Sequence, residues 1–139
     1  MFAILSRHAE PQPSGTDPGL SPKGRDRAKV LAAMLEETGI DAIFTSELRR
    51  TKETAAPIAE RLSLTPVVLS ADLAVAAGQV RSAGQRVLVI GHSNTVPDLI
   101  GSLNGPSNVT ITPLEFSRLF VLDLDGPTGN LLSMRYGAI

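Results

Sequence analysis

The segment Arg86–Gly91, with the sequence RVLVIG, is the strongest strand signal in the chain and restricts the folds open to it. Its four consecutive apolar residues would be buried on both faces of a strand, which is typical of a central strand in a parallel sheet. Short strand-like segments alternate with helix-like segments along most of the chain. This alternation predicts an α/β fold, a three-layer αβα sandwich around a mostly parallel central sheet.

The order of elements follows from apolar periodicity and from the Gly and Pro positions. The expected strands cover residues 2–6, 41–45, 66–69, 86–91, 116–124 and 131–136. The expected helices cover residues 22–38, 46–62, part of 70–85, and a segment that begins at Ser93 or Asn94 and stops before Gly105. Pro57 should kink the second helix or split off its last turns. The last two strands, joined by a turn at 126–129, are expected to form an antiparallel hairpin at the edge of the sheet.

Composition sets outer limits on the kind of protein. The 139 residues include 42% hydrophobic and 19% charged residues, as expected for one globular domain over residues 1–139. The absence of Cys excludes disulfides, Cys-ligated metals and a thiol nucleophile. A net charge of −1 gives no reason to expect nucleic acid or a membrane surface as a partner. The sequence shows no signal peptide or membrane segment, so a cytoplasmic location is the default expectation.

The chain has only two histidines, and each directly follows a predicted strand. His8 follows the first strand and His92 follows the central strand. A single histidine in such a place is most simply a cap on a strand or helix. Because parallel strands place ligands at their carboxyl ends, however, both histidines are expected at the same edge of the sheet.

Cationic side chains are expected at the same edge. Arg7 adjoins His8, and Arg50 begins the helix after the second strand, whereas Arg49 is expected to pair with Glu47 or Glu53. Ser93 lies at a helix start, where free N–H groups favour an anion. Guanidinium groups bind phosphate through paired hydrogen bonds, and a neutral histidine beside them can act as a nucleophile on phosphorus.

Other chemistries fit the sequence less well. There is no histidine pair at helix spacing to hold a metal, and the arginines would repel a cation. No phosphate-binding glycine loop and no serine elbow motif occurs. The basic residues Lys23, Arg25, Arg27 and Lys29 alternate too quickly to share one helix face, so we interpret them as a solvated surface.

Four sequence blocks together resemble the histidine phosphatase superfamily, which has the phosphoglycerate mutase-like fold, and in particular its short bacterial members. The blocks are SRHAE at 6–10, LSPKG at 20–24, TSELRRTKETA at 45–55 and GHSN at 91–94. The resemblance implies phosphoryl transfer without metal or cofactor, through a phosphohistidine on His8. It assigns Arg7, Arg50 and His92 to phosphate binding and to stabilisation of the transition state. The substrate would be a phosphorylated small molecule or a phosphoprotein, and the oligomeric state stays open.

The sequence departs from the family in two places. Many members carry a general acid in an L-x-E pattern after the third strand, or as Asp after the second histidine. Here these positions read Leu73-Ala74-Val75 and Ser93, so the acid is either Asp72, in a shifted register, or missing, with Glu10 and Glu115 as weaker alternatives.

The second departure is that the segment before the central strand, residues 69–85, is short, which indicates an open site. An open site favours a phosphatase over a mutase. A phosphate-binding domain with little or no turnover is the alternative, and a structural α/β domain without a site is the third hypothesis.

Overall fold

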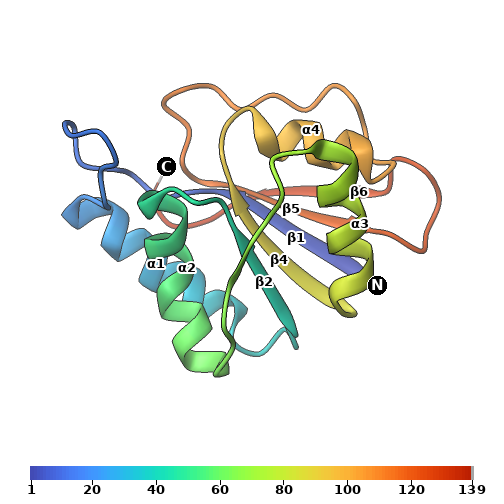
Figure 1. Ribbon diagram of the computed structural model, residues 1–139, viewed down its shortest axis with the longest axis horizontal. Coiled ribbons are helices and arrows are strands. Elements are labelled where there is room, and N and C mark those ends of the chain that lie inside the picture. The colour runs from blue at the N-terminus through green and yellow to red at the C-terminus, as the bar shows by residue number, and fades with distance from the viewer. Residues whose placement is uncertain (139) are drawn as a thin grey trace.

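The sheet has six strands in the computed structural model, which describes residues 1–138 (Figure 1). The strands are β1 (Phe2–Arg7), β2 (Ala42–Thr45), β3 (Val67–Val68), β4 (Arg86–Gly91), β5 (Arg118–Asp123) and β6 (Leu131–Arg135). They lie in the order β3-β2-β4-β1-β5-β6. The first four of these pair in parallel, while β5 pairs antiparallel with both β1 and β6. The mostly parallel sheet with a hairpin at its edge is therefore confirmed. Ile139, the last residue of the predicted domain, lies outside the described residues.

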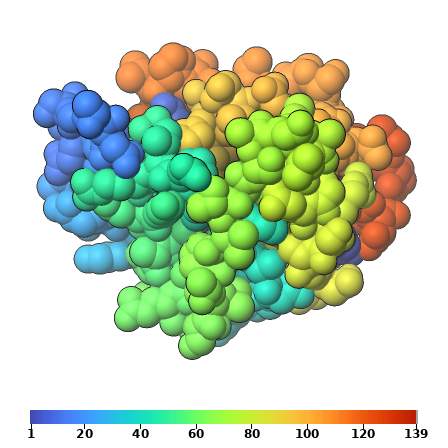
Figure 2. All heavy atoms as spheres, in the orientation of Figure 1, coloured from blue at the N-terminus to red at the C-terminus, as the bar shows by residue number. Residues whose placement is uncertain are grey.

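Helices cover both faces of the sheet, which confirms the three-layer prediction. They are α1 (Pro22–Leu35), α2 (Arg49–Leu62), α3 (Leu73–Ala83) and α4 (Thr95–Ser102). Helices α1 and α2 pack on one face, and α3 and α4 pack on the other. The space-filling view shows the light-green chain between α2 and α3 running over one face of the molecule (Figure 2). Within residues 1–138, no helix is both long enough and apolar enough to cross a membrane.

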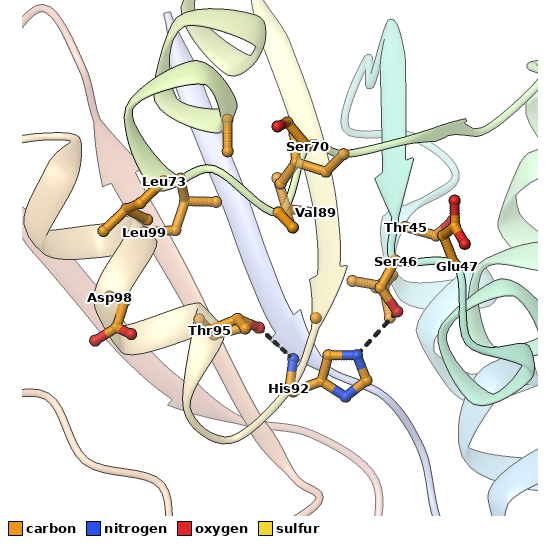
Figure 3. Close-up of a pocket in the computed structure, with 16 residues that line it drawn as sticks. Thr45, Ser46, Glu47, Ser70, Leu73, Val89, His92, Thr95, Asp98 and Leu99 are labelled. Carbon is orange, nitrogen blue, oxygen red and sulfur yellow. Dashed lines mark hydrogen bonds between the residues drawn. The ribbon is translucent and has the colours of Figure 1, made fainter. Parts of the chain in front are cut away.

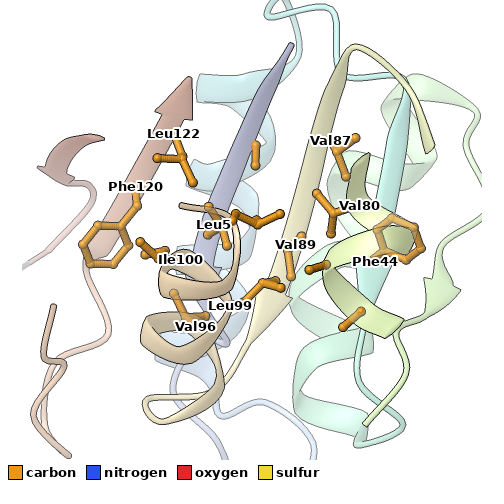
Figure 4. Close-up of a cluster of buried hydrophobic side chains, with 14 of the residues drawn as sticks. Leu5, Phe44, Val80, Val87, Val89, Val96, Leu99, Ile100, Phe120 and Leu122 are labelled. Atoms are coloured by element: carbon orange, nitrogen blue, oxygen red, sulfur yellow. The ribbon is translucent and has the colours of Figure 1, made fainter. Parts of the chain in front are cut away.

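The core consists of two apolar layers separated by the sheet. Alternating residues of β1 and β4 point to opposite faces, so Leu5 and Val89 pack under α3 and α4 whereas Ile4 and Leu88 pack under α1 and α2. Figure 4 shows the layer that contains α3 and α4, including the fully buried Phe120. Both faces of β4 are buried, which explains why four consecutive residues of this strand are apolar.

Local signals set most helix ends. Ser21 caps α1, accepting a hydrogen bond from Gly24 N at 3.1 Å, and Pro22 takes the first helical position as expected. Helix α2 begins at Arg49 rather than at Ser46. It also continues through Pro57 to Leu62, so of the two effects expected of Pro57, a kink or a split, the split does not occur. The buried Ile58, directly after the proline, packs against the sheet and stabilises the last turn.

The interpretation of the basic residues on α1 as solvated is wrong for Arg27, although its three basic neighbours are exposed. Arg27 is only 5% exposed. Its guanidinium forms two hydrogen bonds with the Glu10 carboxylate, at 2.8 and 3.1 Å, and donates to the carbonyls of Tyr136 and Ala138. A buried guanidinium is tolerated because its donors are paired. Arg27 thereby joins α1 to the chain just after β1 and to the C-terminal segment.

Candidate active site

Two histidines and two arginines meet at the carboxyl ends of β1, β2 and β4. We refer to Arg7, His8, Arg50 and His92 as the basic cluster. The His8 backbone N–H donates to Gly91 O at 2.9 Å, which ties the chain after β1 to the end of β4. The His8 and His92 ring centroids are 5.3 Å apart, with the rings inclined at 62°. The structure thus brings together the two histidines that the sequence places after different strands.

The His8 ring has a defined orientation and tautomer. It is 4% exposed, and Nδ1 lies 2.7 Å from Ala9 O. A carbonyl oxygen can only accept, so Nδ1 carries the hydrogen and Nε2 carries the lone pair. Within residues 1–138, no hydrogen bond engages Nε2. The neutral ring therefore presents a free base.

Burial and neighbouring cations keep both histidines neutral. The pKa of His8 is lowered from 6.5 to about 4, chiefly by burial; Arg7, His92 and Arg50 also lower it, while the hydrogen bond to Ala9 opposes the shift. Burial, then Arg50 and Arg7, lowers the pKa of His92 to about 4. At neutral pH, the uncharged form of each ring predominates.

The Arg7 guanidinium is clamped by the loop before β5. Its Nη1 donates to the carbonyls of Pro113 and Glu115, each at 2.9 Å, and the group lies 4.1 Å from the Phe116 ring centroid. Its Nε is buried without a hydrogen-bond partner. Burial, and then the nearby Arg50 charge, lowers the pKa of Arg7. A guanidinium group beside a second cation fits an oxyanion.

Arg50 and Arg49 are adjacent in sequence but differ in their partners. Arg49 pairs with Glu53 at 2.9 Å, which confirms that expectation. Arg50 is half-buried, and within residues 1–138 it has no carboxylate partner. Thr54 fixes its position, because the Thr54 hydroxyl accepts from Ala9 N at 2.8 Å and donates to Arg50 O at 2.7 Å. The same hydroxyl therefore connects the backbones that carry Arg50 and His8.

His92 is held by a serine that our sequence analysis did not single out. Ser46 Oγ lies 2.8 Å from His92 Nε2, and the His92 backbone N–H donates to Thr95 Oγ1 at 2.9 Å (Figure 3). The signal was present in the block at 45–55, which contains Ser46. Ser93 is half-buried and lies two residues before α4, and Asn94 is the N-cap residue but makes no side-chain cap bond.

The three carboxylates considered as general acids all have structural partners. Asp72, the main candidate, is exposed at the N-cap of α3, where it accepts from Val75 N at 3.1 Å. Burial alone would raise the pKa of Glu10, but hydrogen bonds from Arg27 give a net lowering. The Thr112 N–H, followed by Arg135, lowers the pKa of Glu115 to about 2. Glu10 and Glu115 are therefore ionised at neutral pH and are not proton donors.

Groups suited to a cation are not found in the described chain. No three His, Asp or Glu side chains of residues 1–138 gather closely enough to hold a metal ion. The basic cluster instead offers N–H donors and positive charge, which match the oxygens of a phosphoryl group.

Sequence comparison identifies relatives of this chain. The profile of the histidine phosphatase superfamily (branch 1) matches residues 3–78, more than half of the chain. A PE-PGRS family protein of Mycobacterium tuberculosis is 34% identical over 110 residues, which cover 74% of this chain and 19% of that protein. Phosphoserine phosphatase 1 of Hydrogenobacter thermophilus is 44% identical over 68 residues, 44% of this chain and 32% of that enzyme. The chain thus spans a third or less of the length of these curated relatives.

Structural comparison covers nearly the whole chain. The protein histidine phosphatase SixA, solved with tungstate, superposes with a TM-score of 0.75 at 20% identity, covering 97% of both chains. A mycobacterial glucosyl-3-phosphoglycerate phosphatase, solved with VO3, gives a TM-score of 0.72 at 17% identity and covers 99% of both chains. At these identities the likeness shows the shared fold.

Proposed function

Because the chain belongs to the histidine phosphatase superfamily, we propose that it hydrolyses phosphoric monoesters or phosphohistidine through a covalent intermediate on His8, without a metal ion. The observation that carries this proposal is the state of His8. Its ring is neutral, anchored through Nδ1, and presents Nε2 beside two guanidinium groups. This combination makes a histidine nucleophilic at neutral pH.

In the first step, the basic cluster holds the phosphoryl group. The Arg7 and Arg50 guanidinium groups and His92 bind the non-bridging oxygens, where negative charge develops in the transition state. His8 Nε2 attacks phosphorus, the P–N bond forms, and the bond to the leaving group breaks. The leaving group departs with the bonding electron pair. The phosphorylated ring is cationic, and its Nδ1–H donates to Ala9 O.

In the second step, water attacks the phosphohistidine. The new P–O bond replaces the P–N bond, and His8 regains the lone pair on Nε2. The water releases one proton, and the anion expelled in the first step takes up one proton. The net reaction converts a phosphate ester and water into an alcohol and inorganic phosphate.

Because the candidate carboxylates are bound to other groups, the reaction favours leaving groups that depart without protonation. Glu10 and Glu115 are ionised, and the Asp72 carboxylate is engaged as a helix cap, so we propose that the reaction proceeds without a carboxylate proton donor. Without a proton donor, aryl oxides and the nitrogen of phosphohistidine leave faster than alkoxides. Hydrolysis is favoured over mutase chemistry because the segment at 69–85 adds only the short helix α3 beside the site. The tungstate in SixA and the VO3 in the mycobacterial phosphatase further support an oxyanion site.

The direct test is hydrolysis of p-nitrophenyl phosphate in EDTA by the wild-type protein and by His8→Ala. We expect turnover that the chelator does not affect and that His8→Ala reduces at least about 1,000-fold. Activity that survives the substitution would contradict the covalent mechanism. Phosphate binding without turnover of any substrate would favour the alternative, a phosphate-binding domain.

A further inference from the structure

A cleft of about 380 Å³ opens beside His92, between α3 and α4. One end is formed by His92 and Ser46, and most of the side chains farther in are apolar (Figure 3). These include Leu69, Leu73, Val89, Val96 and Leu99. We refer to this space as the apolar cleft. Its volume is within the range that holds a small organic group.

The charges on the apolar cleft differ in sign from those of the basic cluster. Among residues 1–138, its only acidic side chains are Glu47 and Asp98, and no lysine or arginine lines it. The two carboxylates lie on opposite sides of the opening (Figure 3). They repel an anion, and no cation is available to pair with a second acidic group of a substrate.

We infer that the apolar cleft binds the leaving group of the substrate, and that this group is uncharged, apolar and about the size of an aromatic ring system. The inference rests on the proposed function, because the cleft adjoins the basic cluster at His92. When the basic cluster holds the phosphate oxygens, the rest of the substrate extends into the cleft, beside Leu73 and Leu99. Burial of apolar surface then provides binding energy for this part of the substrate. Phosphorylated acids, which carry a second negative charge, fit poorly.

The test compares kcat/KM for three aryl phosphates whose leaving groups have similar basicity. We expect 2-naphthyl phosphate to exceed phenyl phosphate by about tenfold, since one more fused ring is buried. A carboxyphenyl phosphate should fall about tenfold below phenyl phosphate, because Glu47 and Asp98 repel it. Replacing both with Glu47→Gln and Asp98→Asn should recover most of that loss.

Helix α3 offers a matched pair of variants. Leu73 lines the cleft and is 41% exposed, whereas Val75 lies two residues on, is 52% exposed and does not line it. An aspartate at either position lies in the first turn of α3, where a carboxylate is favoured, so both variants should fold. Leu73→Asp should reduce the preference for naphthyl over phenyl phosphate at least about fivefold. Val75→Asp should change that preference less than about twofold.

The outcomes separate this inference from the proposed function. Phosphoramidate, whose leaving group is too small to reach the cleft, reports the phosphoryl transfer alone. If it is hydrolysed with dependence on His8 but the aryl esters show no preference, the inference is wrong and the proposed function stands. Faster turnover of the carboxyphenyl ester than of the phenyl ester would also overturn the inference. If no phosphate compound is hydrolysed, both fail.

Discussion

The two ends of the site are built from different parts of the fold. The basic cluster lies on the ends of buried strands and on the first turn of α2, and hydrogen bonds fix its backbone and the side chains of Arg7, His8 and His92. The apolar cleft lies between the short helices α3 and α4, and its lining has few polar contacts. Reacting groups must be held in a fixed orientation, which the hydrogen-bonded basic cluster provides. The apolar cleft tolerates substitutions that change its shape, so related proteins can differ there in the substrate they bind.

The strongest test of this comparison removes one cation from the basic cluster. Arg50→Met should lower kcat/KM for p-nitrophenyl phosphate by roughly 100- to 1,000-fold, because the charge that develops on phosphoryl oxygen loses a partner. Arg49→Met is the matched control. Arg49 is adjacent, exposed and paired with Glu53, so its loss should change the rate less than about twofold. Equal losses in the two variants would contradict the assignment of Arg50.

The next largest effect is on stability and concerns the buried ion pair between Arg27 and Glu10. Arg27→Met leaves the Glu10 carboxylate partly buried without its main partner, so it should lower the free energy of unfolding by about 2–3 kcal/mol. Lys23 is exposed, and its Nζ lies 3.8 Å from the same carboxylate. Lys23→Met should therefore lower the free energy of unfolding by less than about 0.5 kcal/mol. Urea denaturation measures both. An Arg27 variant as stable as the Lys23 variant would show that the buried pair contributes little.

His8 and His92 should become protonated at a pH well below the usual histidine pKa of 6.5. Because each folded-state pKa is lowered from 6.5 to about 4, the unfolded chain binds more protons between these values. The free energy of unfolding should therefore decrease as the pH falls from 6.5 towards 4. The chain has only two histidines, so proton NMR of their ring Cε1–H signals follows the site directly. Midpoints near pH 6.5 for His8 and His92 would contradict the burial of uncharged rings.

The smallest effect is expected at Asp72. Asp72→Asn keeps a good N-cap residue on α3, and should change the turnover of alkyl and aryl phosphates by less than about twofold each. Steady-state rates on both substrates provide the comparison. A selective loss with alkyl phosphates would assign Asp72 as the general acid.

Sequence reasoning located the residues whose position depends on local signals. His8 and His92 follow apolar strands, so the topology of a parallel sheet is enough to predict that they meet. Buried Arg27 was missed because the apolar stripe of α1 does not reveal a pairing with Glu10 on another element. The cap role of Asp72 had a signal, an Asp directly before a helical segment, which the search for an acid overlooked. The apolar cleft depends on how α3 and α4 pack, which no single segment encodes.

The most direct test of the central claim is to trap the intermediate. The protein is mixed with phosphate ester labelled in the phosphoryl group and quenched in alkali within milliseconds, and the label is mapped by mass spectrometry. The account predicts a phosphoryl group on Nε2 of His8 that is stable in alkali and released in acid. Label on His92, or steady turnover with no label on His8, would contradict it.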